Sequence, residues 1–220
     1  MEKTHSLKEF LGTSLRHLWD LMVLNWMWFL CSLPIITIGP ATCGLYSVTL
    51  KLAREELVNP AKDFFLGLKR NFKAGLVLEL AAVVPLVVAL GDLWFAVQQT
   101  GALKSLYLAL AVLAVMLFLS LISYSFALQA MFDNTIKQQI LNSFKLALVA
   151  PGRTILIWVI LLLPVIAALT MAPAVLQVIG FLYLVMGFSG PVYGASCILR
   201  NIFDRVNGAS REDVPPTAEK

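Results

Sequence analysis

Few ionisable side chains lie inside the apolar runs of this chain, where they could bind a substrate or move a proton. The clearest is Glu79, which follows "FKAGLVL" and has no other charged residue near it until Asp92. A carboxylate in hydrocarbon is costly, so it usually has a partner or lines a pathway. One interpretation pairs Glu79 with a Lys or Arg, or with lipid headgroups, near the membrane surface. The other places it on an inward-facing cavity, where it takes part in substrate or proton binding.

Asn25 is the second polar residue of this kind, in the stretch "VLNWMW". An uncharged amide inside an apolar helix is explained more simply by an interhelical hydrogen bond than by contact with a ligand. We therefore predict such a bond and keep Asn25 with Glu79 as candidate binding or structural residues.

The remaining reactive side chains do not form a recognisable catalytic or metal-binding pattern. His5 and His17 lie in or beside the N-terminal tail, and Cys31, Cys43 and Cys197 are isolated in apolar segments, so we predict no metal site. The chain has neither a phosphate-binding Gly-Lys-Ser/Thr loop nor a Gly-x-Ser-x-Gly nucleophile turn. We expect no catalytic residues, no cofactor and no enzyme activity.

Composition indicates the elements that position these residues. Of the 220 residues, 59% are hydrophobic and 14% are charged, which is typical of an integral membrane protein. Apolar runs suited to a ~30 Å hydrocarbon core recur, without the alternating pattern of barrel strands. We predict an all-α, polytopic transmembrane helical bundle in one domain, 1–206, followed by a disordered cytoplasmic tail, 207–220. Its six apolar segments are 18–33, 41–52, 74–96, 106–128, 154–172 and 175–199.

Charge placement predicts the topology of this bundle. Of the 17 Lys and Arg residues, all but Lys104 fall into four clusters at the chain ends and between pairs of segments. Cytoplasmic loops are rich in Lys and Arg, so we expect these clusters and both termini to face the cytoplasm. The protein is then a multi-pass protein of the cytoplasmic (inner) membrane, in contact with membrane lipid and not with nucleic acid. The segments pair as three hairpins, 16–54, 74–128 and 154–200.

The first hairpin needs a sharp bend, and "LPIITIGP" provides it. Proline and glycine interrupt a helix there, and Pro40 suits the first turn of a new one. The arms are short, about 27 Å for 16–33 and about 21 Å for 41–54 at ~1.5 Å per residue. The bend either reaches the outer face or stops inside the membrane as a re-entrant loop, which requires protein or water around its backbone. The candidate binding or structural motif comprises Pro34, Thr37, Gly39, Pro40 and Tyr46.

A second Gly-Pro pair lies in the last apolar segment. The stretch "GPATCG" at Gly39 is similar to "GPVYGAS" at Gly190, each placed at a helix start or kink within an apolar run. The similarity indicates either related elements or chance agreement between apolar segments.

The string "LPIITIGPATCGLYSVTLKLAREE", followed by "KDFFLGLKRNFKAG", resembles the YesL-like family of bacterial membrane proteins, a domain of unknown function. The resemblance is specific over the first third of the chain, and the length and segment pattern fit the family over nearly all of it. Family members commonly sit in gene neighbourhoods with carbohydrate ABC transporters and polysaccharide-degrading enzymes. The resemblance therefore implies a role near sugar uptake, and it supplies no catalytic residues.

Two amphipathic helices are predicted at the inner face, at 60–73 and 135–149. In the first, Asn59 can cap the helix and Pro60 can occupy its first turn. Such cationic helices either lie on lipid, pack under the bundle as connecting elbows, or dock a cytoplasmic partner. The candidate docking residues for a partner or lipid are Phe64, Phe65, Phe72, Lys69, Arg70 and Lys73.

Two functions fit this sequence. One is a non-enzymatic accessory of a carbohydrate uptake or utilisation system, with ABC-transporter subunits or a second copy of the chain as partners. The alternative is a small-molecule carrier with its site between the broken hairpins. The accessory predicts that Glu79→Gln is tolerated, whereas the carrier predicts that this variant loses transport.

Overall fold

The computed structural model describes residues 2–100, 104–132, 134–170, 180, 181, 183 and 185–212. These residues form helices and connecting turns without any strand, which confirms the all-α class. The elements are α1 (Glu2–Cys31), the 3₁₀ turn η1 (Ile35–Thr37), α2 (Ile38–Ala53), α3 (Pro60–Arg70), α4 (Phe72–Gln98), α5 (Lys104–Met131), α6 (Ile136–Val149), α7 (Pro151–Thr170) and α9 (Ser189–Glu212).

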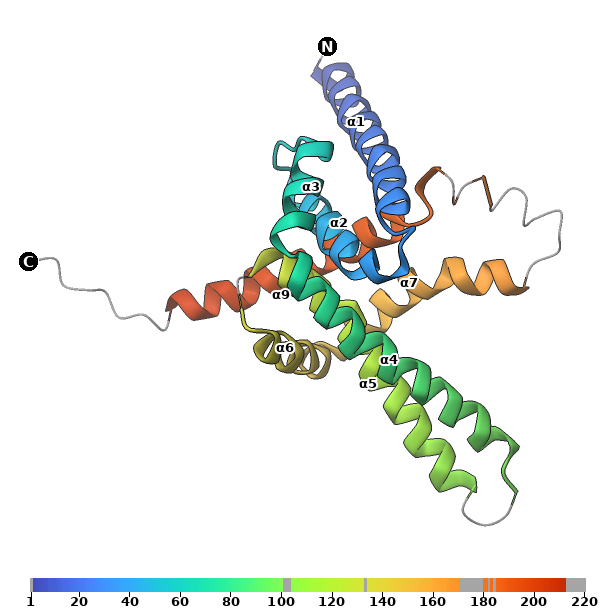
Figure 1. Ribbon diagram of the computed structural model, residues 1–220. Coiled ribbons are helices and arrows are strands. Elements are labelled where there is room, and N and C mark those ends of the chain that lie inside the picture. Colours follow the sequence, from blue (N-terminus) through green and yellow to red (C-terminus); the bar gives the residue numbers. More distant parts are fainter. Residues whose placement is uncertain are drawn as a thin grey trace, which may run out of the picture.

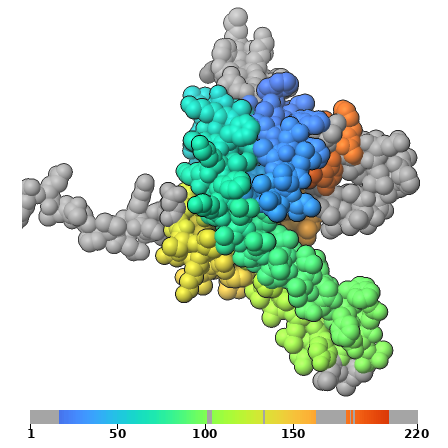
Figure 2. All heavy atoms as spheres, in the orientation of Figure 1, coloured from blue at the N-terminus to red at the C-terminus, as the bar shows by residue number. Residues whose placement is uncertain are grey.

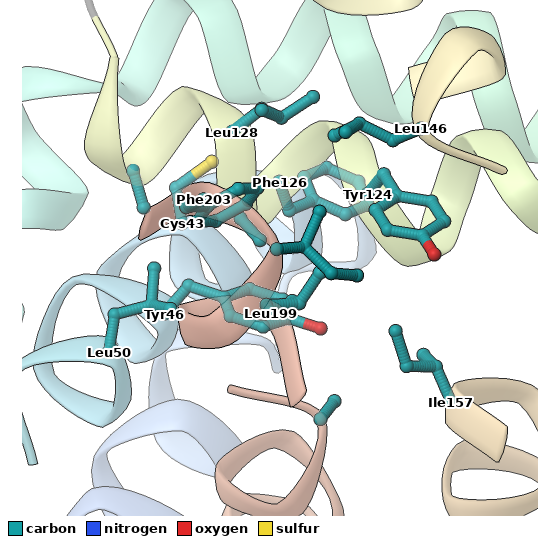
Figure 3. Packing of buried hydrophobic residues seen from close by; sticks show 14 of the residues in the cluster. Cys43, Tyr46, Leu50, Tyr124, Phe126, Leu128, Leu146, Ile157, Leu199 and Phe203 are labelled. Atoms are coloured by element: carbon teal, nitrogen blue, oxygen red, sulfur yellow. The ribbon is translucent and has the colours of Figure 1, made fainter. Parts of the chain in front are cut away.

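Helix α2 lies at the centre of the fold, and the longer helices leave it in different directions (Figure 1). Most of its side chains are buried. On one side, Tyr46 contributes to a core shared with α5 and α9, where Tyr124 and Phe203 are labelled in Figure 3. On the other side, Leu45 and Phe64 belong to a second cluster shared with α1 and α3. Helix α2 is therefore covered largely by the neighbouring helices.

Three stretches are long and apolar enough to cross a membrane: η1 with α2 (Ile35–Ala53), α4 and α5. A fourth results if α6 and the first part of α7 count as one span, although they meet at 107°. Six spans were predicted. Segment 18–33 lies largely in α1, which does not meet the same test, and part of 175–199 lies outside the described residues. The orientation of the termini stays a prediction.

Local signals place several helix boundaries where the sequence predicted them. The Asn59 side chain accepts a hydrogen bond from the backbone N–H of Lys62, and Pro60 begins α3. Thr135 and Gln138 form a reciprocal cap at the start of α6. Helix α9 continues to Glu212, well into the predicted disordered tail, and residues 213–220 lie outside the described part of the chain.

Helices α3 and α4 run antiparallel to α2. Gly67 of α3 lies beside Ser47, and Gly75 of α4 lies beside Pro40 at the beginning of α2. Helix α4 then continues from Glu79 to Gln98, about 28 Å at ~1.5 Å per residue. This outer part of α4 pairs with α5 as a hairpin that projects from the body of the protein (Figures 1 and 2).

Candidate functional site

The predicted bend separates α1 from α2. Helix α1 ends at Cys31, and Pro34 precedes the 3₁₀ turn. The Thr37 hydroxyl lies 2.6 Å from both the Cys31 and the Pro34 carbonyl oxygens, to which it can donate. Pro40 sits in the first turn of α2, where a missing N–H costs no helical hydrogen bond. Thr37 and Pro40 therefore build the bend, while Pro34 is exposed on it.

Glu79 caps the N-terminus of α2. Its Oε2 accepts a hydrogen bond of 2.8 Å from the backbone N–H of Gly39, and its side chain is 8% exposed. The first N–H groups of a helix have no partner within it, and the capping residue Thr37 offers none from its side chain. A carboxylate from α4 supplies the acceptor and also interacts favourably with the positive end of the helix dipole. Neither interpretation of Glu79 included this partner, because only tertiary packing brings the Gly39 N–H within reach of the carboxylate.

The bond depends on a close approach of two helix backbones. A Cβ added to Gly39 would lie 2.8 Å from Glu79 Cβ, and one added to Gly75 would lie 2.7 Å from the Pro40 nitrogen. Neither position has room for a side chain. Small residues at membrane helix contacts allow such an approach, and here they bring α4 onto the beginning of α2.

Asn25 caps a second helix N-terminus, that of α9, where the chain breaks before Ser189. Its Oδ1 accepts hydrogen bonds from the N–H groups of Phe188 (2.9 Å) and Ser189 (3.2 Å), and its Nδ2 donates to the Tyr183 carbonyl (3.1 Å). Ser189 begins α9, and its hydroxyl donates to the Leu21 carbonyl of α1. The interhelical hydrogen bond expected of Asn25 is present, and its partners are backbone groups that a helix break leaves open.

The two Gly-Pro helices lie side by side and run in the same direction. Thr49 of α2 and Ser196 of α9 share a buried hydrogen bond of 2.8 Å, and the Arg200 guanidinium donates to the Ala53 carbonyl at the end of α2. Each helix has its Gly-Pro pair in the first turn and is capped by a side chain from another helix. The sequence similarity at Gly39 and Gly190 therefore corresponds to a similarity in structure.

Aromatic side chains fill the space between the breaks. Trp28 donates through Nε1 to the Thr42 hydroxyl (3.1 Å), and its ring lies 4.3 Å from that of Phe188, centroid to centroid. Two small cavities, of about 180 and 160 Å³, share Tyr183 and Phe188 in their walls. Both are below the ~300 Å³ from which ordinary ligand pockets start.

All of the predicted docking residues except Phe64 are exposed. Phe65, Lys69, Phe72 and Lys73 are exposed, with Leu66 among them, and we call these five residues the α3–α4 strip; Figure 2 shows that α3 and the beginning of α4 lie on the surface. Two further candidates, Phe64 and Arg70, are not part of this strip.

Phe64 is fully buried, because this face of α3 packs on α1 and α2. Arg70 is exposed, but its Nη2 donates to the Ala130 carbonyl (2.7 Å) and so caps the end of α5. Both residues stabilise the fold of the unit that presents the strip.

Sequence reasoning missed a buried chain of amides beneath this unit. Gln129 of α5 donates to Asn71, between α3 and α4, and Gln139 of α6 donates to Gln129 (3.1 and 3.3 Å). Gln139 is fully buried and also donates to the Phe132 carbonyl. The only sequence signal is that three amides occur near the ends of apolar segments. The network joins α5 and α6 to the junction of α3 and α4, at the end opposite the projecting hairpin.

Comparison with known proteins gives one result for this region. Residues 21–93 match a family model described as "Protein of unknown function, DUF624". The match covers about a third of the chain and runs from α1 through α4, which includes the first break, Glu79 and the α3–α4 strip. No curated protein and no solved structure matches the chain. Among the described residues, no three His, Cys, Asp or Glu side chains are grouped to hold a metal ion.

Proposed function

We propose that this chain is a YesL-like membrane protein that acts as a non-enzymatic accessory of a carbohydrate uptake or utilisation system. The observation that carries the proposal is the α3–α4 strip, an exposed row of aromatic and cationic side chains on a rigidly held unit. Gene neighbourhoods of the family that the sequence resembles supply the carbohydrate context.

The unit that carries the strip is well suited to present a surface. Helix α3 lies against α2 at Gly67, where an added Cβ would be 2.7 Å from Ser47 Cβ. Helix α4 is held in the same way at Gly75 and by the Glu79 hydrogen bond. A preorganised surface binds with a smaller loss of conformational freedom than a mobile one. A strip of aromatic and Lys side chains suits a membrane-protein partner whose cytoplasmic surface is acidic.

The polar groups at the helix breaks favour this function over chemistry in the interior. Glu79, Asn25 and Thr37 all bind backbone groups of the chain itself. A substrate that needed these groups would have to displace hydrogen bonds that hold α2 and α9 in place. We infer that the partner is a subunit of the transport system, bound at the strip.

The test is purification of the full chain from its own membranes in mild detergent, with mass spectrometry of the proteins that accompany it. We expect transporter subunits in stoichiometric amount with the natural chain. The double variant Phe65→Ala, Lys69→Glu should lose them, because it removes an exposed ring and reverses a charge on the strip.

The matched control is Phe95→Ala, Lys104→Glu, which makes the same changes at an exposed ring and an exposed Lys on the far end of the α4–α5 hairpin. This variant should retain the partner. A clean homo-oligomer in every sample, or equal loss in both variants, contradicts the proposal.

The carrier remains the second candidate because the two breaks lie side by side with a buried carboxylate at one of them. In a carrier, Glu79 would have to release the Gly39 N–H and bind a substrate or a proton instead. Ligand-dependent stabilisation of the isolated protein, together with loss of transport in Glu79→Gln, would favour it over the accessory.

A further inference from the structure

A larger apolar groove lies on another side of the molecule, between α5, α6 and α7. The chain turns by 107° between α6 and α7, and this turn leaves a space of about 400 Å³. Its walls include Leu113, Leu117, Phe144, Leu148, Ile155 and Trp158. The volume falls within the range of roughly 300–1,000 Å³ typical of ligand sites.

The walls are mostly apolar and favour an apolar occupant. The two hydroxyls in the walls are already bonded, Thr154 to the Tyr124 hydroxyl and Ser120 to the Met116 carbonyl. Several wall side chains are nevertheless exposed, including Leu117 at 41% and Leu148 at 79%. The indole Nε1 of Trp158, another wall residue, is buried and has no hydrogen-bond partner among the described residues. A hydrocarbon chain can cover the rest of this surface without leaving a further polar group unpaired.

Helix α6, which contributes Phe144 and Leu148 to the groove, also carries exposed cations. Lys137, Leu141, Lys145 and Leu148 follow one another at helical spacings of three and four residues, and all four are exposed or partly exposed. A helix with this stripe places leucines in the acyl boundary and lysines among anionic headgroups. Arg153, in the first turn of α7, adds a third cation at the turn.

The groove also extends in the direction that a lipid requires. From Pro151 to Trp158 its α7 wall rises by about 10 Å at ~1.5 Å per residue, away from α6. A headgroup over α6 would therefore be followed by an acyl chain along α7 and α5.

We propose that the groove between α5, α6 and α7 binds one acyl chain of an anionic glycerophospholipid, whose headgroup lies over Lys145 and the α6–α7 turn. This inference is independent of the proposed accessory function, because the groove and the α3–α4 strip share no residue. It assigns a lipid site to a part of the chain outside the match to residues 21–93.

The experiment uses the full chain in mild detergent with added phosphatidylglycerol or phosphatidylcholine, followed by native mass spectrometry. We expect one phosphatidylglycerol to be retained in preference to phosphatidylcholine. Leu117→Trp should reduce this retention because the larger ring occupies the groove. The matched control, Leu110→Trp, makes the same change at an exposed α5 position outside the groove walls and should retain the lipid.

A charge variant tests the headgroup separately. Lys145→Gln should lower phosphatidylglycerol retention about fivefold, as expected for one Lys at an anionic surface, and leave phosphatidylcholine unchanged. Lys104→Gln, at the far end of α5, should change neither. Equal retention of the two lipids by the natural chain, or equal retention by Leu117→Trp and Leu110→Trp, overturns the proposal.

Discussion

A helix that begins inside a protein leaves N–H groups that water cannot reach, and two helices of this chain begin in that way. Glu79 serves one with a carboxylate, and Asn25 serves the other with an amide that both accepts and donates. At the start of α2 only the Gly39 N–H needs a partner, so an acceptor is enough. At the start of α9 the Tyr183 carbonyl also needs a donor. This difference explains why a charged residue suits one break and a neutral residue suits the other.

Substitution of Glu79 should separate the need for an acceptor from the need for a charge. Glu79→Ala leaves the Gly39 N–H buried without a partner, which should lower the free energy of unfolding by about 1–3 kcal/mol. Glu79→Gln keeps an acceptor oxygen and should cost clearly less. Thermal unfolding in detergent measures both, with Asp92→Ala as the control at an exposed acid of the same helix. Equal stability of Glu79→Ala and the natural chain would show that the bond contributes nothing.

Asn25→Asp offers a second test of the same principle. The variant keeps the acceptor for Phe188 and Ser189 but loses the donor to the Tyr183 carbonyl, and it adds a charge in a side chain that is 2% exposed. We expect a larger loss of thermal stability than for Glu79→Gln, because the substitution leaves an acceptor facing an acceptor. A smaller loss would contradict this assignment of donor and acceptor.

Among the elements, those with local signals could be predicted from the sequence. Asn59 and Pro60 place the start of α3, and the Pro and Gly residues of the bend place the break before α2. The partners of Glu79 could not be predicted, because Gly39 is 40 residues away and only packing brings the two together. Phe64 shows a related limit: helical periodicity groups it with Phe65, but the structure turns one toward the core and the other outward.

The contact between α2 and α4 can be tested with two glycines of one helix. An added methyl group at Gly75 meets backbone atoms of Pro40, so Gly75→Ala should destabilise the protein by about 1–3 kcal/mol. Gly91 of α4 has no neighbour within 4 Å of an added Cβ, and Gly91→Ala should be neutral or stabilising by up to ~1 kcal/mol because alanine favours the helix. Thermal unfolding of the two variants in parallel checks the difference in sign, and equal effects would contradict the close approach.

For the whole molecule, the depth of the bend decides between the two topologies that the sequence left open. The bend lies beside the second turn of α4, and about 28 Å of α4 continues beyond it at ~1.5 Å per residue. That length alone is close to the ~30 Å hydrocarbon core. If this part of α4 spans the hydrocarbon core, the first hairpin does not cross it, and the bend lies near the boundary at which this part of α4 begins. Gly39 and Pro40 are buried against α4 there, whereas Pro34 and Ile36 are exposed on the bend.

Cysteine labelling measures this depth. In a chain whose three natural cysteines are replaced, Thr100→Cys marks the outer end of α4 and Ile36→Cys marks the bend, where the side chain is 69% exposed. An impermeant maleimide should label Thr100→Cys from one side of the membrane and should not label Ile36→Cys from that side. Labelling of both from the same side would place the bend at the same face as the end of α4.

The two caps also impose an order on biosynthesis. Asn25 is made 164 residues before Ser189, so the start of α9 meets its cap as soon as it leaves the ribosome. The start of α2 must instead wait for Glu79, 40 residues later, which takes about 2–8 s at ~5–20 residues per second. During that interval the insertion machinery has to shelter an uncapped helix, so a nascent chain arrested before Glu79 should be held there and released into the bilayer only after α4 has followed.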